Sequence, residues 1–188
     1  MDQRRNGDRV SGIRSRARDV RQALAEVPAA ADWRRCALLY LLFLAIALPV
    51  GLTSGLLHPS LPPLTAGAAL FAAATIALHP ALTEELVFRA LILPRVAHRV
   101  SRRRLAITLV VSLALYVAAH PLNARLFWPA AFGVFSNPFY LTLAALLGLT
   151  CSAAYLISGS IWPPVAIHWL TVTVWILLLG GQSLLSGV

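Results

Sequence analysis

Two adjacent glutamates lie inside an apolar run, in the segment Thr83–Arg89, and Arg89 follows the second of them by four residues. The chain has seven acidic residues, and Glu84 and Glu85 are the only ones beyond residue 32. An ionised carboxylate is costly in an apolar environment, so such groups are usually paired or functional. The spacing of Glu85 and Arg89 places them on one helix face and predicts an ion pair. Glu84 is then left without a partner and available as a general base toward water.

Two histidines in later apolar segments are candidates to complete a site with this carboxylate. His120 ends one apolar run, four residues after Tyr116, and His168 lies inside another. A single histidine in an apolar helix is more often a packing residue than a catalytic one. Two histidines together with a glutamate pair, in a chain that otherwise excludes buried charge, favour a catalytic site instead. The other histidines lie beside prolines or in loops and are interpreted as structural: His58, His79 and His98.

The composition predicts a single membrane domain. Hydrophobic residues make up 59% of the 188 residues and charged residues 12%, which is more apolar than a water-soluble fold needs. We predict an all-α, polytopic bundle of about five transmembrane helices. Pro80 lacks a backbone N–H and is expected to kink the second span just before the carboxylates. The expected spans are 36–57, 64–94, 105–119, 139–157 and 162–179, with a sixth if the irregular connection 121–138 contains an interfacial or re-entrant helix.

Arginines are concentrated in two parts of the chain and predict its orientation. Nine of the sixteen precede residue 36, five more fall between residues 95 and 104, and the net charge is +9. Such blocks beside apolar spans are typical of cytoplasmic segments that face anionic lipid, so we predict a cytoplasmic N-terminus. No stacking aromatic residues lie among the arginines, which argues against nucleic-acid binding. Residues 1–35 are expected to form a basic cytoplasmic leader, as an amphipathic surface helix or a loosely ordered tail, before a transmembrane domain at 36–188.

The order and spacing of these residues resemble the motifs of the CAAX-protease and bacteriocin-processing family. Its members are intramembrane proteases related to the eukaryotic prenyl-protein endopeptidase. The resemblance covers about residues 66–180 and implies an endopeptidase of the bacterial inner membrane that cleaves a membrane-anchored protein or peptide, such as a prenylated tail or a C-terminal sorting signal. The matching positions are Pro80, Glu84, Glu85, Phe88 and Arg89, then Tyr116 and His120, and then His168.

The resemblance also implies a role for each candidate residue. Glu84 would be the base that activates water, supported by Glu85 and Arg89. His120 would position or polarise that water, and His168 would stabilise the oxyanion of the tetrahedral intermediate. No cofactor is implied, although a Glu/His/His set can also bind zinc, which leaves a metalloprotease mechanism as the alternative. The expected partners are the substrate and the lipid bilayer, and the oligomeric state is left open.

Position 172 departs from the family pattern. The last motif usually has Asn or Asp four residues after its histidine, where this chain has Val172, so an expected donor is missing. Thr171 lies on nearly the same helix face and is a candidate substitute. Tyr116 in place of Phe and Ala90 in place of Gly are milder changes.

The missing donor at position 172 leaves an alternative function, a catalytically inactive relative that acts as a membrane scaffold or binding protein. A small transporter or proton-relay protein would need polar residues along several helices, and the first and fourth spans have almost none.

Overall fold

The computed structural model describes residues 15–95 and 100–186, and its regular structure is helical. The longer helices are α2 (Ala30–Thr53), α5 (Arg102–Phe127), α7 (Pro138–Ser158) and α8 (Trp162–Leu178). The glutamates lie in a composite helix made of α3 (Ala66–Ile76), η1 (Ala77–Leu82), α4 (Thr83–Glu85) and η2 (Leu86–Leu91). The short elements are η4 (Pro129–Ala131), α6 (Phe132–Phe135) and α9 (Gly181–Ser186).

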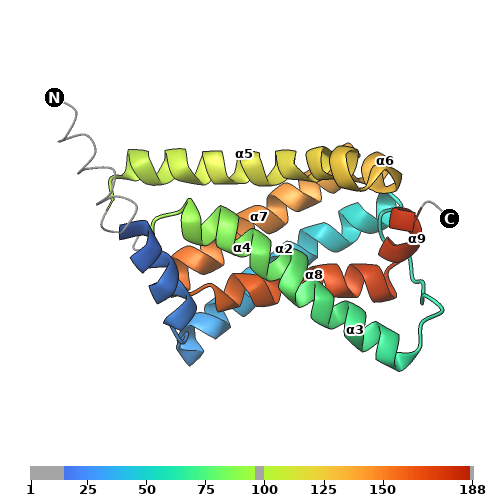
Figure 1. Cartoon of the computed structure of the whole chain (residues 1–188), viewed down its shortest axis with the longest axis horizontal. Helices are drawn as coiled ribbons and strands as arrows, with labels where there is room; N and C mark the ends of the chain where they lie inside the picture. The colour runs from blue at the N-terminus through green and yellow to red at the C-terminus, as the bar shows by residue number, and fades with distance from the viewer. Residues whose placement is uncertain (1–14, 96–99, 187–188) are drawn as a thin grey trace.

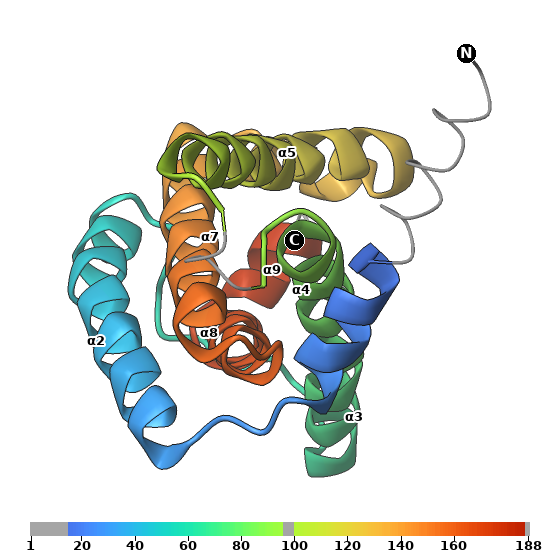
Figure 2. The same ribbon diagram turned by 90° about the vertical axis from the view of Figure 1, so that its left-hand side faces the viewer.

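The predicted all-α membrane bundle is confirmed. In the described residues, α2, the composite helix, α5 and α7 are long and apolar enough to cross a membrane, and α8 is a shorter apolar helix. Large apolar side chains on these helices face outward, as lipid-exposed residues do: Leu41, Leu70 and Val110 are 60%, 72% and 66% exposed. Figure 2 shows α7 and α8 in the middle, with α2, the composite helix and α5 on three sides.

The expected kink at Pro80 is confirmed in the helix that carries the glutamates. His79 has non-helical dihedrals, φ −143° and ψ 120°, which a residue before proline favours. η1 therefore contains a break between two helical segments, and the wider turns of a π-helix are found after the glutamates, in η2. In η2 the carbonyl of Phe88 accepts a hydrogen bond from the hydroxyl of Ser112 on α5, which ties the two spans together.

Two helix boundaries differ most from the sequence prediction. α2 begins at Ala30 rather than at residue 36, because the carboxylate of Asp32 accepts a hydrogen bond from the backbone N–H of Ala29 at 3.2 Å and caps an earlier start. α5 continues through Pro121 to Phe127, where an irregular connection was expected. Proline removes one backbone donor, but the next turn is held by burial of Ala124 and by packing of α5 against η4 and α6. The sixth helix of the prediction is represented only by the short η4 and α6.

The described part of the N-terminal leader lies against one end of the bundle (Figure 1). Residues 15–25 are helical, and Ala23 is fully buried. Arg16 donates a hydrogen bond to the carbonyl of Leu93 at 3.0 Å, and the N–H of Ile161 donates to the carbonyl of Ala23 at 3.1 Å. The leader therefore contacts the loop that follows the composite helix and the residue that precedes α8. The composite helix carries Glu84, and α8 carries His168. Residues 1–14 of the expected leader lie outside the described residues.

Candidate active site

Glu85 is the structural partner within the glutamate pair. Its side chain is fully buried, and its two oxygens lie close to different neighbouring side chains. Oε2 lies 3.1 Å from Nε of Arg89, so the ion pair expected from the spacing is present. Oε1 lies 2.8 Å from Nδ1 of His168 on α8. Glu85 thus connects its own helix to α8 and orients the histidine ring.

Arg89 is held on several sides, which fixes Glu85 in turn. One guanidinium nitrogen donates to the carbonyl oxygen of Gly148 on α7 at 2.9 Å. The guanidinium also lies 4.5 Å from the centroid of the Tyr116 ring, a favourable cation–π arrangement. The helices approach closely here because residue 148 has no side chain: a Cβ at that position would lie 2.9 Å from atoms of Tyr116 and Leu113.

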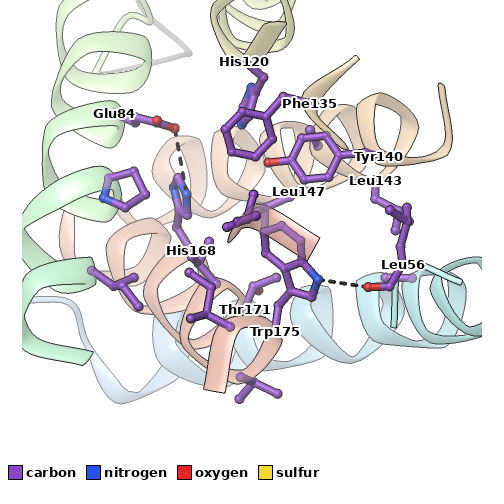
Figure 3. Close-up of a pocket in the computed structure, with 18 of the residues that line it drawn as sticks. Leu56, Glu84, His120, Phe135, Tyr140, Leu143, Leu147, His168, Thr171 and Trp175 are labelled. Carbon is purple, nitrogen blue, oxygen red and sulfur yellow. Dashed lines mark hydrogen bonds and ion pairs between the residues drawn. The ribbon is translucent and has the colours of Figure 1, made fainter. Parts of the chain in front are cut away.

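Glu84 faces a cavity instead of a paired cation. Its side chain is 20% exposed, and its Oε2 lies 3.9 Å from Nε2 of His168, beyond hydrogen-bond distance (Figure 3). The cavity has a volume of about 700 Å³ and is lined mostly by apolar side chains, together with Glu84, His120 and His168. Glu84 is therefore the carboxylate of the pair that can reach water or a substrate.

The two histidines reach this cavity from different helices. His168 on α8 is 1% exposed, and its two ring nitrogens face the two glutamates. His120 on α5 has Nδ1 at 2.9 Å from the carbonyl oxygen of Tyr116, one turn earlier. Its ring packs edge-on against Tyr116, with centroids 4.9 Å apart. Figure 3 shows Glu84, His120 and His168 around the same part of the cavity, so the structure brings the separate sequence motifs together.

The residues near the end of the last motif also line the cavity. Val172 is among them, as is Thr171, the candidate substitute for the missing donor. The hydroxyl of Thr171 donates to the carbonyl of Ile167 in its own helix at 2.8 Å, with a second contact of 3.4 Å to the hydroxyl of Tyr40. This hydroxyl is thus engaged within α8 and at the α2 interface.

Other cavity residues were not identified from the sequence. Tyr140 near the start of α7 and Trp175 on α8 line the cavity, with ring centroids 5.7 Å apart. His79 lines it as well, with Nδ1 at 3.0 Å from the hydroxyl of Thr83. The sequence does place the tyrosine hydroxyl in an apolar span, which could have indicated a site residue. Sequence spacing, however, does not tell which side of a helix faces a cavity formed by other helices.

The donor arrangement does not match a zinc site. Within residues 15–95 and 100–186, no three His, Cys, Asp or Glu side chains are grouped so that they could hold a metal ion. Zinc sites need three or four such ligands at about 2.0–2.3 Å. Nδ1 of His168 is directed at Glu85, which leaves Nε2 and the carboxylate of Glu84 as a pair, and the described part of the chain adds no third ligand to it. We therefore derive no catalytic step through a metal.

Comparison with known families yields a match over much of the chain. The family described as Rce1-like, type II CAAX prenyl endopeptidase, matches residues 65–174. This segment is more than half of the chain and contains every candidate site residue from Glu84 to His168. No curated protein and no solved structure is similar enough to count as a match.

Proposed function

Residues 65–174 match the model of the Rce1-like family of type II CAAX prenyl endopeptidases, so the chain belongs to that family, and we propose that it cleaves its substrate with water activated by Glu84. The observation that supports this proposal is the difference between the two glutamates. Glu85 is buried, forms an ion pair with Arg89 and is hydrogen-bonded to His168, whereas Glu84 faces the cavity. A carboxylate that has no arginine partner and is directed at a cavity with room for water and a substrate has the properties of a general base.

In the proposed reaction, the carboxylate of Glu84 takes a proton from water as the water oxygen attacks the carbonyl carbon of the scissile peptide. The carbonyl π electrons move to its oxygen and form the oxyanion. When the C–N bond breaks, those electrons re-form the carbonyl, and Glu84 returns its proton to the leaving amine. His120, which faces the same part of the cavity from α5, positions the water. No covalent bond between enzyme and substrate is needed.

His168 is proposed to stabilise the oxyanion, and Glu85 sets its orientation. In the doubly protonated ring, Nδ1–H donates to Glu85 and Nε2–H is the donor that faces the cavity. Donors that are fixed before the reaction stabilise developing charge without reorganisation. Arg89 contributes indirectly, because it holds Glu85 through the 3.1 Å ion pair.

We further propose that the substrate is a membrane-anchored peptide, either a prenylated tail or a C-terminal sorting signal. The mostly apolar lining of the cavity suits such a chain.

The protein is integral to the membrane, and we propose that it lies in the bacterial inner membrane with a cytoplasmic N-terminus. In support, residues 15–30 and the arginine-rich start of α5 lie at the same end of the bundle (Figure 1). Val172 favours the rival function, an inactive scaffold.

Both histidines are expected to be needed for cleavage. The purified protein is reconstituted in liposomes with a farnesylated C-terminal peptide or with a lipid-anchored, non-prenylated peptide, and the products are identified by mass spectrometry. His120→Ala and His168→Ala should each lower kcat/KM by about 10²–10⁴-fold. His58→Ala is the matched control, because His58 does not line the cavity and should leave the rate unchanged. Histidine variants as active as wild type would refute the site, and a wild type that cleaves neither peptide would favour the scaffold.

Removal of metal ions is expected to leave cleavage intact. Since the described residues form no metal-ligand cluster, treatment with 1,10-phenanthroline followed by gel filtration should not change the rate. The same peptides serve as substrates, and bound zinc is measured by elemental analysis. Loss of activity that returns on addition of zinc would instead support the metalloprotease mechanism.

A further inference from the structure

The last motif contributes one candidate oxyanion donor, His168. The motif usually supplies a second donor four residues later, where this chain has Val172. Val172 has no polar atom, although it lines the cavity. The hydroxyl of Thr171 already donates to the carbonyl of Ile167 at 2.8 Å. A second donor would therefore have to come from another helix.

Tyr140 on α7 meets this requirement. It lines the same cavity as Glu84, His120 and His168. Figure 3 shows its hydroxyl directed into the cavity, toward the part where Glu84 and His168 lie. Among the described residues, the phenol oxygen makes no hydrogen bond, in contrast to the hydroxyl of Thr171.

Packing fixes the orientation of the Tyr140 ring. Its centroid lies 5.0 Å from that of Phe135, 5.5 Å from His120 and 5.7 Å from Trp175. These rings come from α6, α5 and α8, so the tyrosine is enclosed by aromatic groups of three neighbouring helices. A side chain held in this way can present a donor without first losing rotational freedom, which is the condition for effective stabilisation of a transition state.

We propose that Tyr140 is a further catalytic residue, whose hydroxyl donates a hydrogen bond to the carbonyl oxygen of the scissile peptide and to the oxyanion derived from it. This inference rests on the proposed hydrolytic function. A phenol keeps its proton at neutral pH and is a competent donor whatever the protonation state of His168. As the water oxygen adds to the carbonyl carbon, the hydrogen bond strengthens while the proton stays on Tyr140. It weakens again when the C–N bond breaks and the carbonyl re-forms.

The first test removes only the hydroxyl. Tyr140→Phe is expected to lower kcat by about 10²–10³-fold with little change in KM, as the loss of one oxyanion donor does in other hydrolases. Tyr155→Phe is the matched control on the same helix, because Tyr155 is fully buried and does not line the cavity. The control should keep the wild-type rate. A Tyr140→Phe enzyme with unchanged kcat, or with only a raised KM, would overturn the proposal.

The second test separates this proposal from the proposed function, since it measures binding and not turnover. Two probes carry the sequence on the N-terminal side of the cut made by the wild type, one ending in an aldehyde and the other in the corresponding alcohol. The hydrated aldehyde resembles the tetrahedral intermediate and should bind the wild type about 10²-fold tighter or more. Tyr140→Phe should lose at least tenfold of that preference. If Tyr140→Phe keeps the wild-type preference for the aldehyde over the alcohol, only the role of Tyr140 is overturned. If the wild type itself binds the aldehyde no tighter than the alcohol, the hydrolytic site is overturned as well.

Discussion

Replacement of Glu84 by glutamine is expected to lower kcat for peptide cleavage by at least about 10³-fold, with little change in KM. Glutamine has nearly the same shape as glutamate and fills the same place at the cavity wall, but it cannot accept a proton from water. The ion pair of Glu85 with Arg89 is left intact, so the fold should be preserved. The measurement is the initial rate of cleavage of the reconstituted protein over a range of substrate concentrations.

Glu26→Gln is the matched control for this change. Glu26 makes an ion pair with Arg95 at the end of the bundle and is 44% exposed, so the pair contributes little to stability. The rate and the thermal midpoint of this variant should stay close to those of the wild type. If Glu84→Gln also stays close to wild type, Glu84 is not the base, and the division of roles between the two glutamates is wrong.

Replacement of Arg89 by methionine is expected to lower the free energy of unfolding by about 3–5 kcal/mol. The change removes the arginine from the fully buried carboxylate of Glu85 and leaves only His168 beside it, and loss of one member of a buried ion pair is strongly destabilising. It also leaves the carbonyl of Gly148 without the donor that now lies 2.9 Å away. Stability can be followed as the fraction of folded protein in mixed detergent micelles titrated with SDS.

Two further variants distinguish this cause from a simple packing defect. Addition of Glu85→Gln to Arg89→Met removes the buried carboxylate charge and should recover most of the lost stability, because glutamine can still accept from Nδ1 of His168. Arg125→Met changes an exposed arginine at the end of α5 and should shift stability by about 0.5 kcal/mol or less. If the double variant is no more stable than Arg89→Met, the charge is not what destabilises it.

The membrane fold and the candidate site residues were largely predictable from the sequence, because a membrane chain admits few polar groups. Once water-exposed segments are set aside, Glu84, Glu85 and Arg89 are conspicuous, and a spacing of four residues determines which of the glutamates pairs with the arginine. The kink before them followed from proline chemistry in the same direct way. These features depend on local sequence, and local rules were enough.

Features that depend on contacts between distant segments were not predictable. The sequence placed the end of a helix near Pro121, but α5 continues because Ala124 is buried against other elements. The contact between Ala23 of the leader and Ile161 joins segments far apart in the chain, and no pattern in either segment indicates it. Tyr140 was not predictable as a site residue for the same reason, because only the fold brings it to the cavity that the histidines of α5 and α8 also line.

The central claim, that water activated by Glu84 cleaves the peptide bond directly, is tested most directly by hydrolysis in ¹⁸O-labelled water. The reconstituted wild type is taken through many turnovers, and both the product and the peptide of the protein that contains Glu84 are analysed by mass spectrometry. General-base catalysis predicts one labelled oxygen in the new carboxylate of the product and none in Glu84 or Glu85. Label in a glutamate side chain would reveal a covalent acyl intermediate and contradict the claim, as would the absence of any labelled product.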